Sequence, residues 1–317
     1  MNTYPCDVLT VTLNPAIDRT VTIEDFAAGA VNRVERVEQH PGGKGVNVAV
    51  TLADAGHRVA VTGFLGRENC ASFEQLFARK GIADRFVRLE GQTRVGIKIV
   101  DPRRQQTTDI NFPGLTPGPA DRAALLAAIA ALATPWAVLA GSLPPGVDPT
   151  FYRDLTLALR ERACRVVLDT SGDPLRYALE AAPQIIKPNI HELEAALGRP
   201  LHGQGDVIAA ARDLLAGGIE LVIVSMGKDG ALFIDHDEVI SARPPAVAVQ
   251  STVGAGDAMV AGIVSARLRG LPLADAARLA TAFSVDAISR IGAGLNDPAA
   301  IAGIMEAVSV ERVAAGR

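Results

Sequence analysis

The chain has 317 residues, of which 49% are hydrophobic and 4% aromatic, and its formal net charge at pH 7 is −4. The length and apolar content predict one large α/β domain with a small appendage and a substantial core. The negative charge argues against a general nucleic-acid-binding protein, because such proteins are usually basic. We find neither a signal-peptide pattern nor an apolar run of the roughly 18 residues that a membrane-spanning helix needs. With three scattered cysteines, this predicts a cytoplasmic protein without a membrane partner.

The first predicted strand, residues 7–13, ends at a polar loop. Asn14 and Asp18 follow it, and polar residues after strand ends lie where α/β folds keep their ligands. Asp18 could equally be a turn residue or a helix cap. Residues 19–24 and 31–38 then alternate polar and apolar side chains, which predicts exposed antiparallel strands.

A glycine-rich segment around Lys44 is the second candidate site. Gly42, Gly43 and Gly45 flank the lysine, and a helix pattern that contains Asn47 follows. Glycines allow close approach of a ligand, lysine supplies a mobile cation, and asparagine supplies both a donor and an acceptor. The spacing differs from that of a P-loop. The alternative is a flexible turn with a solvated lysine, although asparagine is a poor helix former unless it has a use.

A strand at 58–64 and a helix at 68–80 begin a βαβ rhythm, which implies a parallel sheet. The rhythm then breaks, because three strand patterns follow without a helix between them, at residues 85–89, 94–100 and 107–112.

Together with residues 19–40, the strands within 85–112 predict a small antiparallel sheet outside the main one. A small sheet at the ligand edge is typical of a lid. Arg94 starts one of its strands and is a candidate anion contact. The alternative is a strand-edge charge that limits aggregation.

From residue 121 the α/β alternation resumes. Helices are predicted at 121–133, 149–162, 255–269, 273–289 and 298–307, and strands at 136–140, 165–169, 184–186, 220–225, 231–234 and 239–241. Three of these strands end at polar or glycine-rich turns, which contain Gly141 and Ser142, then Lys187, Asn189 and Glu192, then Ser225, Gly227 and Gly230.

Asn189 starts a predicted helix, and Glu192 lies three residues later, so both can face one site. The alternative is a capping box, in which the glutamate closes back on the first residue of the helix. The two roles are compatible, because the carboxylate could still hold Mg²⁺ through water.

The segment from Ser251 to Met259 joins a strand pattern at 246–249 to a helix of small residues. Two glycines at a strand-to-helix turn, with the positive end of the helix dipole, predict an anion site. Asp257 is out of place there, because a carboxylate repels phosphate. It is either the group that faces the attacking partner or an ordinary acid in the first helical turn. A second glycine-rich turn, residues 290–294, could close over the same site.

The strand ends therefore offer a polar side, from Asn14 to Ser142, and a side with a lysine, a carboxylate and glycine turns, from Lys187 to Asp257. The first suits a polyhydroxylated substrate and the second a nucleoside triphosphate. Phosphoryl transfer needs positioning, charge stabilisation and a base for the attacking hydroxyl, and Asp257 fits the last role.

Three motifs resemble the signatures of the ribokinase-like, PfkB-type carbohydrate kinases, in the family's order: Gly42-Gly43-Lys44-Gly45-x-Asn47, Lys187-Pro-Asn189-x-x-Glu192 and Thr252-Val-Gly-Ala-Gly-Asp257. The segments 13–18, 108–114 and 251–259 are similar to the phosphosugar branch, from which Ala258 departs where serine is frequent. The resemblance implies a three-layer α/β sandwich over residues 1–317, with a mostly parallel central sheet and an antiparallel lid that often forms a homodimer interface. It also implies a phosphosugar substrate, ATP, Mg²⁺ and, in some members, K⁺.

Position by position, the resemblance implies the following roles. Asp257 would be the base, with Gly254, Ala255 and Gly256 as the anion hole. The substrate would contact Asn14, Asp18, Gly42, Gly43, Lys44, Asn47, Arg94 and Ser142. ATP would lie along Lys187, Asn189, Ser225, Gly227, Gly230, Thr252, Gly254 and Gly256, with Mg²⁺ near Glu192. A K⁺ loop would involve Ser251, Val253, Ala287, Arg290, Gly292 and Gly294.

The implied activity is ATP-dependent phosphorylation of a phosphosugar, whose identity stays open. The other reading is a catalytically silent sensor of sugar phosphate or nucleotide on the same fold. Asp257, Glu192 and the glycines of the motifs count against the sensor, because a sensor need not keep the base.

Overall fold

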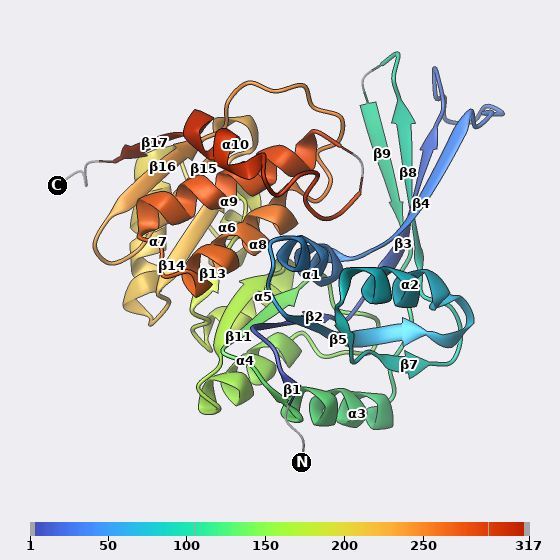
Figure 1. Cartoon of the computed structure of the whole chain (residues 1–317), viewed down its shortest axis with the longest axis horizontal. Coiled ribbons are helices and arrows are strands. Elements are labelled where there is room, and N and C mark those ends of the chain that lie inside the picture. Colours follow the sequence, from blue (N-terminus) through green and yellow to red (C-terminus); the bar gives the residue numbers. More distant parts are fainter. Residues whose placement is uncertain (1–3, 105, 291, 314–317) are drawn as a thin grey trace.

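The computed structural model describes residues 4–104, 106–290 and 292–313, and it has three layers, with a large sheet between two layers of helices (Figure 1). The sheet runs in the order β17-β16-β15-β14-β13-β12-β11-β2-β5-β6, and β7 pairs with β5. Its parallel strands are β2 (Val8–Thr12), β5 (Val59–Gly66), β6 (Ala83–Asp84), β7 (Val87–Leu89), β11 (Trp136–Ala140), β12 (Arg165–Asp169), β13 (Ile185–Ile186) and β14 (Leu221–Ser225). The antiparallel ones are β15 (Ala231–Ile234), β16 (Val239–Arg243) and β17 (Ser309–Arg312).

Both faces of the central strands are buried, which explains their uninterrupted apolar runs. Successive side chains of a strand point to opposite faces, and Val138 and Leu139 of β11 accordingly belong to different cores. One core contains α1 (Lys44–Asp54), α2 (Ala71–Lys80), α8 (Ala255–Leu268), α9 (Leu273–Ile288) and α10 (Ile301–Ala307). The other contains α3 (Pro119–Ala130), α4 (Phe151–Glu161), α5 (Gly172–Leu179), α6 (Ile190–Leu197) and α7 (Gln204–Ala216). This confirms the predicted α/β sandwich.

Helices α8 and α9 pack closely because their contact is made of small residues. A Cβ atom on Gly262 would come within 2.5 Å of the Cα atom of Ala280. Such a distance excludes any larger side chain at position 262, so the small-residue pattern of α8 is a packing requirement.

A second sheet of four strands projects from the body (Figure 1). Its order is β4 (Arg36–Gly42), β3 (Ala16–Thr22), β8 (Val95–Asp101) and β9 (Gln106–Asn111). The prediction of an antiparallel lid is wrong for the central pair, since β3 and β8 run parallel. Parallel pairing needs a long crossover, and α1, β5 and α2 provide it.

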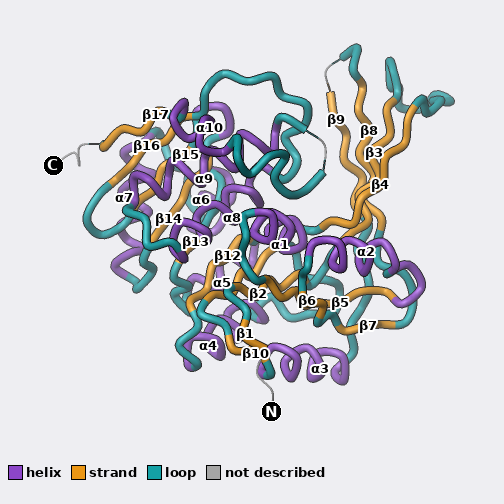
Figure 2. The backbone as a smooth tube through the Cα atoms, in the orientation of Figure 1, coloured by secondary structure: helices purple, strands orange, loops and turns teal. Residues whose placement is uncertain are grey.

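The predicted lid strand at 85–89 is also wrong. Val87–Leu89 pairs with β5, and Leu89 is buried in the core beside α3. The predicted strand at 246–249 lies in a loop that arches from β16 toward α8 (Figure 2). Pro244 and Pro245 lack the N–H group that a ladder needs, and Val249 is 57% exposed. Sequence analysis did not predict α5, α7, β17 or the short pair β1 (Tyr4–Pro5) and β10 (Leu132–Ala133).

Two single-turn 3₁₀ helices complete the described structure, η1 (Arg67–Asn69) and η2 (Gly227–Asp229). None of the described helices is long and apolar enough to cross a lipid bilayer.

Candidate active site

The carboxyl ends of the parallel strands meet at one edge of the sheet, beside the base of the lid and the start of α8. The loops after β2, β11 and β13 bring Asn14, Ser142 and Lys187 to this edge, as predicted. The side chain of Asn14 donates to the Ser142 hydroxyl at 3.3 Å, although 128 positions separate the two residues. The fold therefore assembles one site from loops that are distant in the sequence.

Asp257 lies in the first turn of α8 and is only 7% exposed. The Nδ2 atom of Asn47, at the start of α1, donates to its Oδ2 atom over 2.8 Å. Burial raises the pKa of Asp257 to about 6, and the negative charge of Asp169 adds to the increase, whereas Lys44 and Asn47 oppose it. A carboxylate with such a pKa can accept a proton near neutral pH.

Asp169 joins two lysines of the predicted site. Its Oδ1 atom lies 3.0 Å from Nζ of Lys44 and 3.4 Å from Nζ of Lys187, and its side chain is fully buried. Burial favours the neutral acid, but the two ammonium groups outweigh it and hold the pKa of Asp169 below its usual value. Burial also disfavours the charged form of Lys44, yet the charges of Asp169, Asp257 and Glu192 raise its pKa.

Sequence analysis missed Asp169. The residue ends the predicted strand 165–169, so the rule that selected Asn14 would have found it. Asp169 was overlooked because it is a single acid without a glycine-rich turn beside it. Its importance comes from Lys44 and Lys187, which distant loops bring to it.

The N-terminus of α8 has the predicted anion-binding geometry. Gly254 caps the helix with φ +81°, a conformation that favours glycine, and no side chain caps the first turn. The first N–H groups of a helix have no partner within it and lie at the positive end of the dipole. Nζ of Lys187 lies 3.2 Å from the point that a Cβ atom on Gly256 would occupy, so a second positive group borders the same turn.

A cavity of about 700 Å³ opens on the side of the lid. Its lining includes Asn14, Gly43, Lys44, Arg94 and Ser142. The Arg94 guanidinium donates to the main-chain oxygens of Asn14 and Phe112 over 3.1 to 3.3 Å, and burial lowers the pKa of Arg94. Lys44 and Arg94 give this cavity two cationic walls, which suits an anionic ligand.

Asp18 and Gly42 do not line that cavity. Asp18 and Asn47 line a smaller, neighbouring cavity, and burial raises the pKa of Asp18. A Cβ atom on Gly42 would collide with Oδ2 of Asp18, so Gly42 makes room for the carboxylate.

A second large cavity, of about 590 Å³, lies on the other side of the α8 N-terminus. Five of the eight residues predicted to lie along ATP line it, namely Ser225, Gly227, Gly230, Thr252 and Gly256. Lys187, Asn189 and Gly254 do not, and Gly254 lines the cavity of Asp18 and Asn47 instead. Its remaining wall is largely apolar and includes Val247, Val249 and Ile288. Glycine turns beside an apolar wall are suited to a nucleotide, whose phosphates and base need different surroundings.

Asn189 and Glu192 form the capping box that sequence analysis gave as the alternative. Oδ1 of Asn189 accepts from the Glu192 N–H group, and Oε2 of Glu192 accepts from the Asn189 N–H group, both over 2.9 Å. No cluster of three His, Cys, Asp or Glu residues that could hold a metal occurs in the described part of the chain. A divalent ion here would therefore need ligands from a bound molecule or water.

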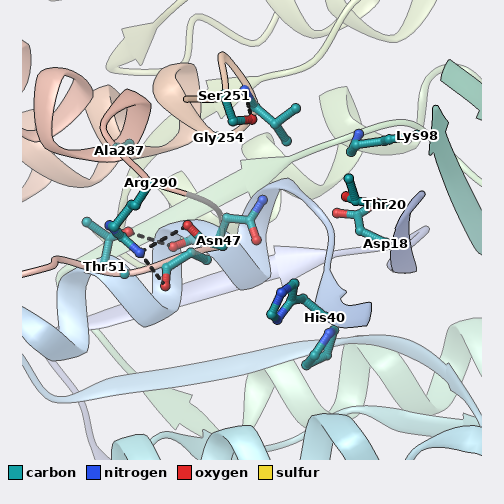
Figure 3. A pocket seen from close by; sticks show the side chains of 16 residues that line it. Asp18, Thr20, His40, Asn47, Thr51, Lys98, Ser251, Gly254, Ala287 and Arg290 are labelled. Carbon is teal, nitrogen blue, oxygen red and sulfur yellow. Dashed lines mark hydrogen bonds between the residues drawn. The ribbon is translucent and has the colours of Figure 1, made fainter. Parts of the chain in front are cut away.

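The six residues of the predicted cation loop line the same cavity as Asp18 and Asn47. Figure 3 shows this cavity with Ser251, Ala287 and Arg290 on one side and Asp18 and Lys98 on the other. Val253, Gly292 and Gly294 complete the loop. Structure and sequence thus agree on which residues gather here.

Comparisons with known proteins connect this arrangement to one family. The model of the pfkB family of carbohydrate kinases matches residues 11–300. The 1-phosphofructokinase of Rhodobacter capsulatus is 51% identical over 307 residues, which cover 96% of this chain and 97% of the relative. A protein named as a possible 1-phosphofructokinase from Thermotoga maritima has a similar solved structure, with 31% identity, a TM-score of 0.86 and coverage of 96% of this chain and 99% of its own. Phosphofructokinase-2 from Escherichia coli, solved in complex with potassium, gives 27% identity, a TM-score of 0.88 and coverage of 95% and 98%.

Proposed function

The chain belongs to the pfkB family of carbohydrate kinases, and we propose that it transfers the γ-phosphoryl group of ATP to the 6-hydroxyl of fructose 1-phosphate, which yields fructose 1,6-bisphosphate. The curated relatives named 1-phosphofructokinase support this substrate. The observation that supports phosphoryl transfer is the buried carboxylate of Asp257, which can act as the general base. Lys44, whose charge lowers the pKa of Asp257, lines one large cavity. Gly256, the residue before Asp257, lines the other.

In the proposed mechanism Asp257 accepts the proton of the 6-hydroxyl. The freed oxygen attacks the γ-phosphorus, and the bond between that phosphorus and the leaving oxygen of ADP breaks. The main-chain N–H groups of Gly254, Ala255 and Gly256 form the anion hole for the transferred group. Lys187 adds positive charge behind Gly256.

The cavity beside the lid is the proposed phosphosugar site. Lys44 and Arg94 hold the phosphate that the substrate already carries, since they are its cationic walls. The hydroxyl groups contact Asn14, Gly43 and Ser142 in this cavity. They also contact Asp18 and Asn47, which line the smaller cavity, while Gly42 acts through the space it leaves for Asp18.

The second cavity is the proposed ATP site, with the phosphates toward Gly227, Thr252 and Gly256 and the base toward the apolar wall. Asn189 does not line this cavity, but it forms an isolated β-bridge with Ser225, which does. A kinase of this family needs a divalent metal, and bound Mg²⁺ neutralises charge on the ATP phosphates. Glu192 is the proposed water-mediated contact. Oδ2 of Asp169, which is buried and has no hydrogen-bond partner among the described residues, is a second candidate oxygen.

Residues 1–317 are proposed to form one kinase domain, whose lid pairs two copies of the chain. Val37 on β4 is 56% exposed and Ile110 on β9 is 44% exposed, and burying these apolar side chains against a second copy would favour association. Sedimentation equilibrium tests this proposal, and a monomer at micromolar concentration would contradict it.

A coupled assay that detects ADP tests the substrate. Purified protein should show its highest kcat/KM with fructose 1-phosphate, against fructose 6-phosphate and tagatose 6-phosphate as matched alternatives. A preference for either alternative would reassign the enzyme within the family. Fructose 6-phosphate is the stronger of the two, because phosphofructokinase-2 from Escherichia coli, a similar protein, has also been solved in complex with fructose 6-phosphate. No turnover on any of the three would favour a non-catalytic sensor.

A further inference from the structure

The turn after α9 is the place where the resemblance implies a K⁺ ion, and its charges are already balanced by the protein. Asp286 is 4% exposed, and its Oδ2 atom lies 3.4 Å from Nε of Arg290. Asp54 holds the other end of the turn by accepting from the N–H group of Leu295 over 2.9 Å, and it pairs with Lys80. Asp286 and Asp54 therefore each have a cationic partner.

The Arg290 side chain also engages two main-chain oxygens of this turn, and one of them, that of Gly292, belongs to the predicted cation loop. Its Nη1 atom donates to the main-chain oxygens of Gly292 and Ala293 over 3.1 and 3.2 Å. Figure 3 shows the side chain directed into the turn, with dashed lines at its hydrogen bonds. K⁺ ions are bound by such rings of carbonyl oxygens, which replace the hydration shell of the ion.

The end of α9, just before this turn, supports the segment that leads into α8. The oxygen of Ile288, the last residue of α9, accepts from the N–H groups of Gln250 and Ser251 over 2.8 and 3.3 Å. The Ser251 hydroxyl accepts from the Val253 N–H group over 3.2 Å. The backbone three and four residues before Gly254 is thus held by the end of α9, two residues before Arg290.

We propose that the Arg290 guanidinium takes the place of a monovalent cation, so that this enzyme works without K⁺. A guanidinium stays charged at every relevant pH and offers five donors in a fixed plane. A K⁺ ion beside it would meet like charge and oxygens that are already engaged. Nη2 of Arg290 is buried and, within the described residues, has no hydrogen-bond partner, so the group still has a donor to spare for this turn.

Exchange of the salt in the buffer tests the proposal on the full chain. Only the activity measurements depend on the proposed function, and the melting measurements do not. The wild-type protein should have the same melting temperature in KCl as in choline chloride of equal ionic strength, and the same kcat/KM. Arg290→Met removes the charge but keeps much of the volume. It should lose activity in choline chloride and regain it in KCl, with a melting temperature that rises by about 3 °C when K⁺ is at about ten times its dissociation constant.

Crystals soaked in rubidium chloride give a readout that does not depend on catalysis. An anomalous peak should occur at the turn in Arg290→Met and not in the wild type. Arg278→Met removes an arginine from α9, the helix before the turn, where Arg278 pairs with Asp275 over 3.3 Å, and should behave like the wild type in every test.

A rubidium peak or a K⁺ response in the wild type would overturn the proposal. So would an Arg290→Met protein that folds but ignores K⁺, since the turn would then not be a cation site. Should this variant fail to fold, the wild-type measurements decide alone. Inactivity of every variant on all three sugars would count against the proposed function and leave the melting and rubidium tests intact.

Discussion

Nζ of Lys44 lies 3.0 Å from Oδ1 of Asp169, although 125 positions separate the two residues. Lys187 reaches the same oxygen from the other side, at 3.4 Å. One buried carboxylate thereby fixes a lysine of the proposed sugar site and a lysine of the proposed phosphate site. Its charge also raises the pKa of Asp257.

Asp169→Asn should impair the enzyme in two separable ways. Because one partner of a buried ion pair is removed, the free energy of unfolding should fall by about 3 kcal/mol or more in denaturant titrations. Because the two lysines lose their common anchor, kcat/KM should fall by roughly 10- to 100-fold.

The pH profile distinguishes this role from a purely structural one. Without the charge of Asp169 the pKa of Asp257 should decrease, so the acid limb of kcat/KM should move to lower pH. Asp173→Asn is the matched control, because the Asp173 side chain is 66% exposed. It should leave the free energy of unfolding and the pH profile of kcat/KM unchanged. A variant of Asp169 with reduced stability but an unmoved acid limb would contradict the electrostatic link.

Asp257→Asn should keep ATP binding near normal, measured by calorimetry, while turnover falls by about a hundredfold or more, because the general base is lost. Unchanged turnover would remove Asp257 from the mechanism.

The same variant should be more stable than the wild type at pH 8. The pKa of Asp257 is raised by folding from 3.8 to about 6, so the contribution of this group to stability is complete below pH 3.8 and is lost as the pH rises through 6. Asparagine carries no charge, so the stability difference should shrink toward pH 4. A difference that does not change with pH would mean that Asp257 is not desolvated as the structure indicates.

The wild-type acid limb should itself have an apparent pKa near 6, since only ionised Asp257 can accept the proton. Asn47→Ala removes a hydrogen bond that lowers the pKa of Asp257, so its limb should move to higher pH, opposite to Asp169→Asn. Thr51→Val, one turn later on α1, removes a hydroxyl whose partner among the described residues is the main-chain oxygen of Asn47, at 2.9 Å, and serves as the control. Limbs that move in the same direction in both variants would refute this assignment.

The sandwich and most strand ends were predictable because their signals are local. A buried strand followed by a glycine turn shows in a few residues, and so the anion turn at Gly254 and the glycines around Lys44 were found. Asp169 was not, because its importance comes from partners that only the sheet order brings near it.

The errors in the lid have the same origin. Residues 85–89 have a strand pattern, but sequence cannot say which sheet they join, and in the structure Val87–Leu89 pairs with β5, so that Leu89 belongs to the core of the body. The residues of the predicted cation loop line one cavity, yet the ion pair between Arg290 and Asp286, on which the proposed replacement of K⁺ rests, is visible only in the three-dimensional arrangement.

Arg94→Ala should raise KM for the phosphosugar far more than KM for ATP, because Arg94 lines the cavity beside the lid and not the second large one. Steady-state kinetics with each substrate varied in turn measures this. Arg94 also donates to the main-chain oxygens of Asn14 and Phe112, so part of the loss could come from looser loops. Arg103→Ala is the control, since Arg103 belongs to the lid but pairs with Glu24 and Asp25 at its far end. It should change neither KM, and an equal rise of both KM values in Arg94→Ala would assign Arg94 to the structure of the lid instead of to the substrate phosphate.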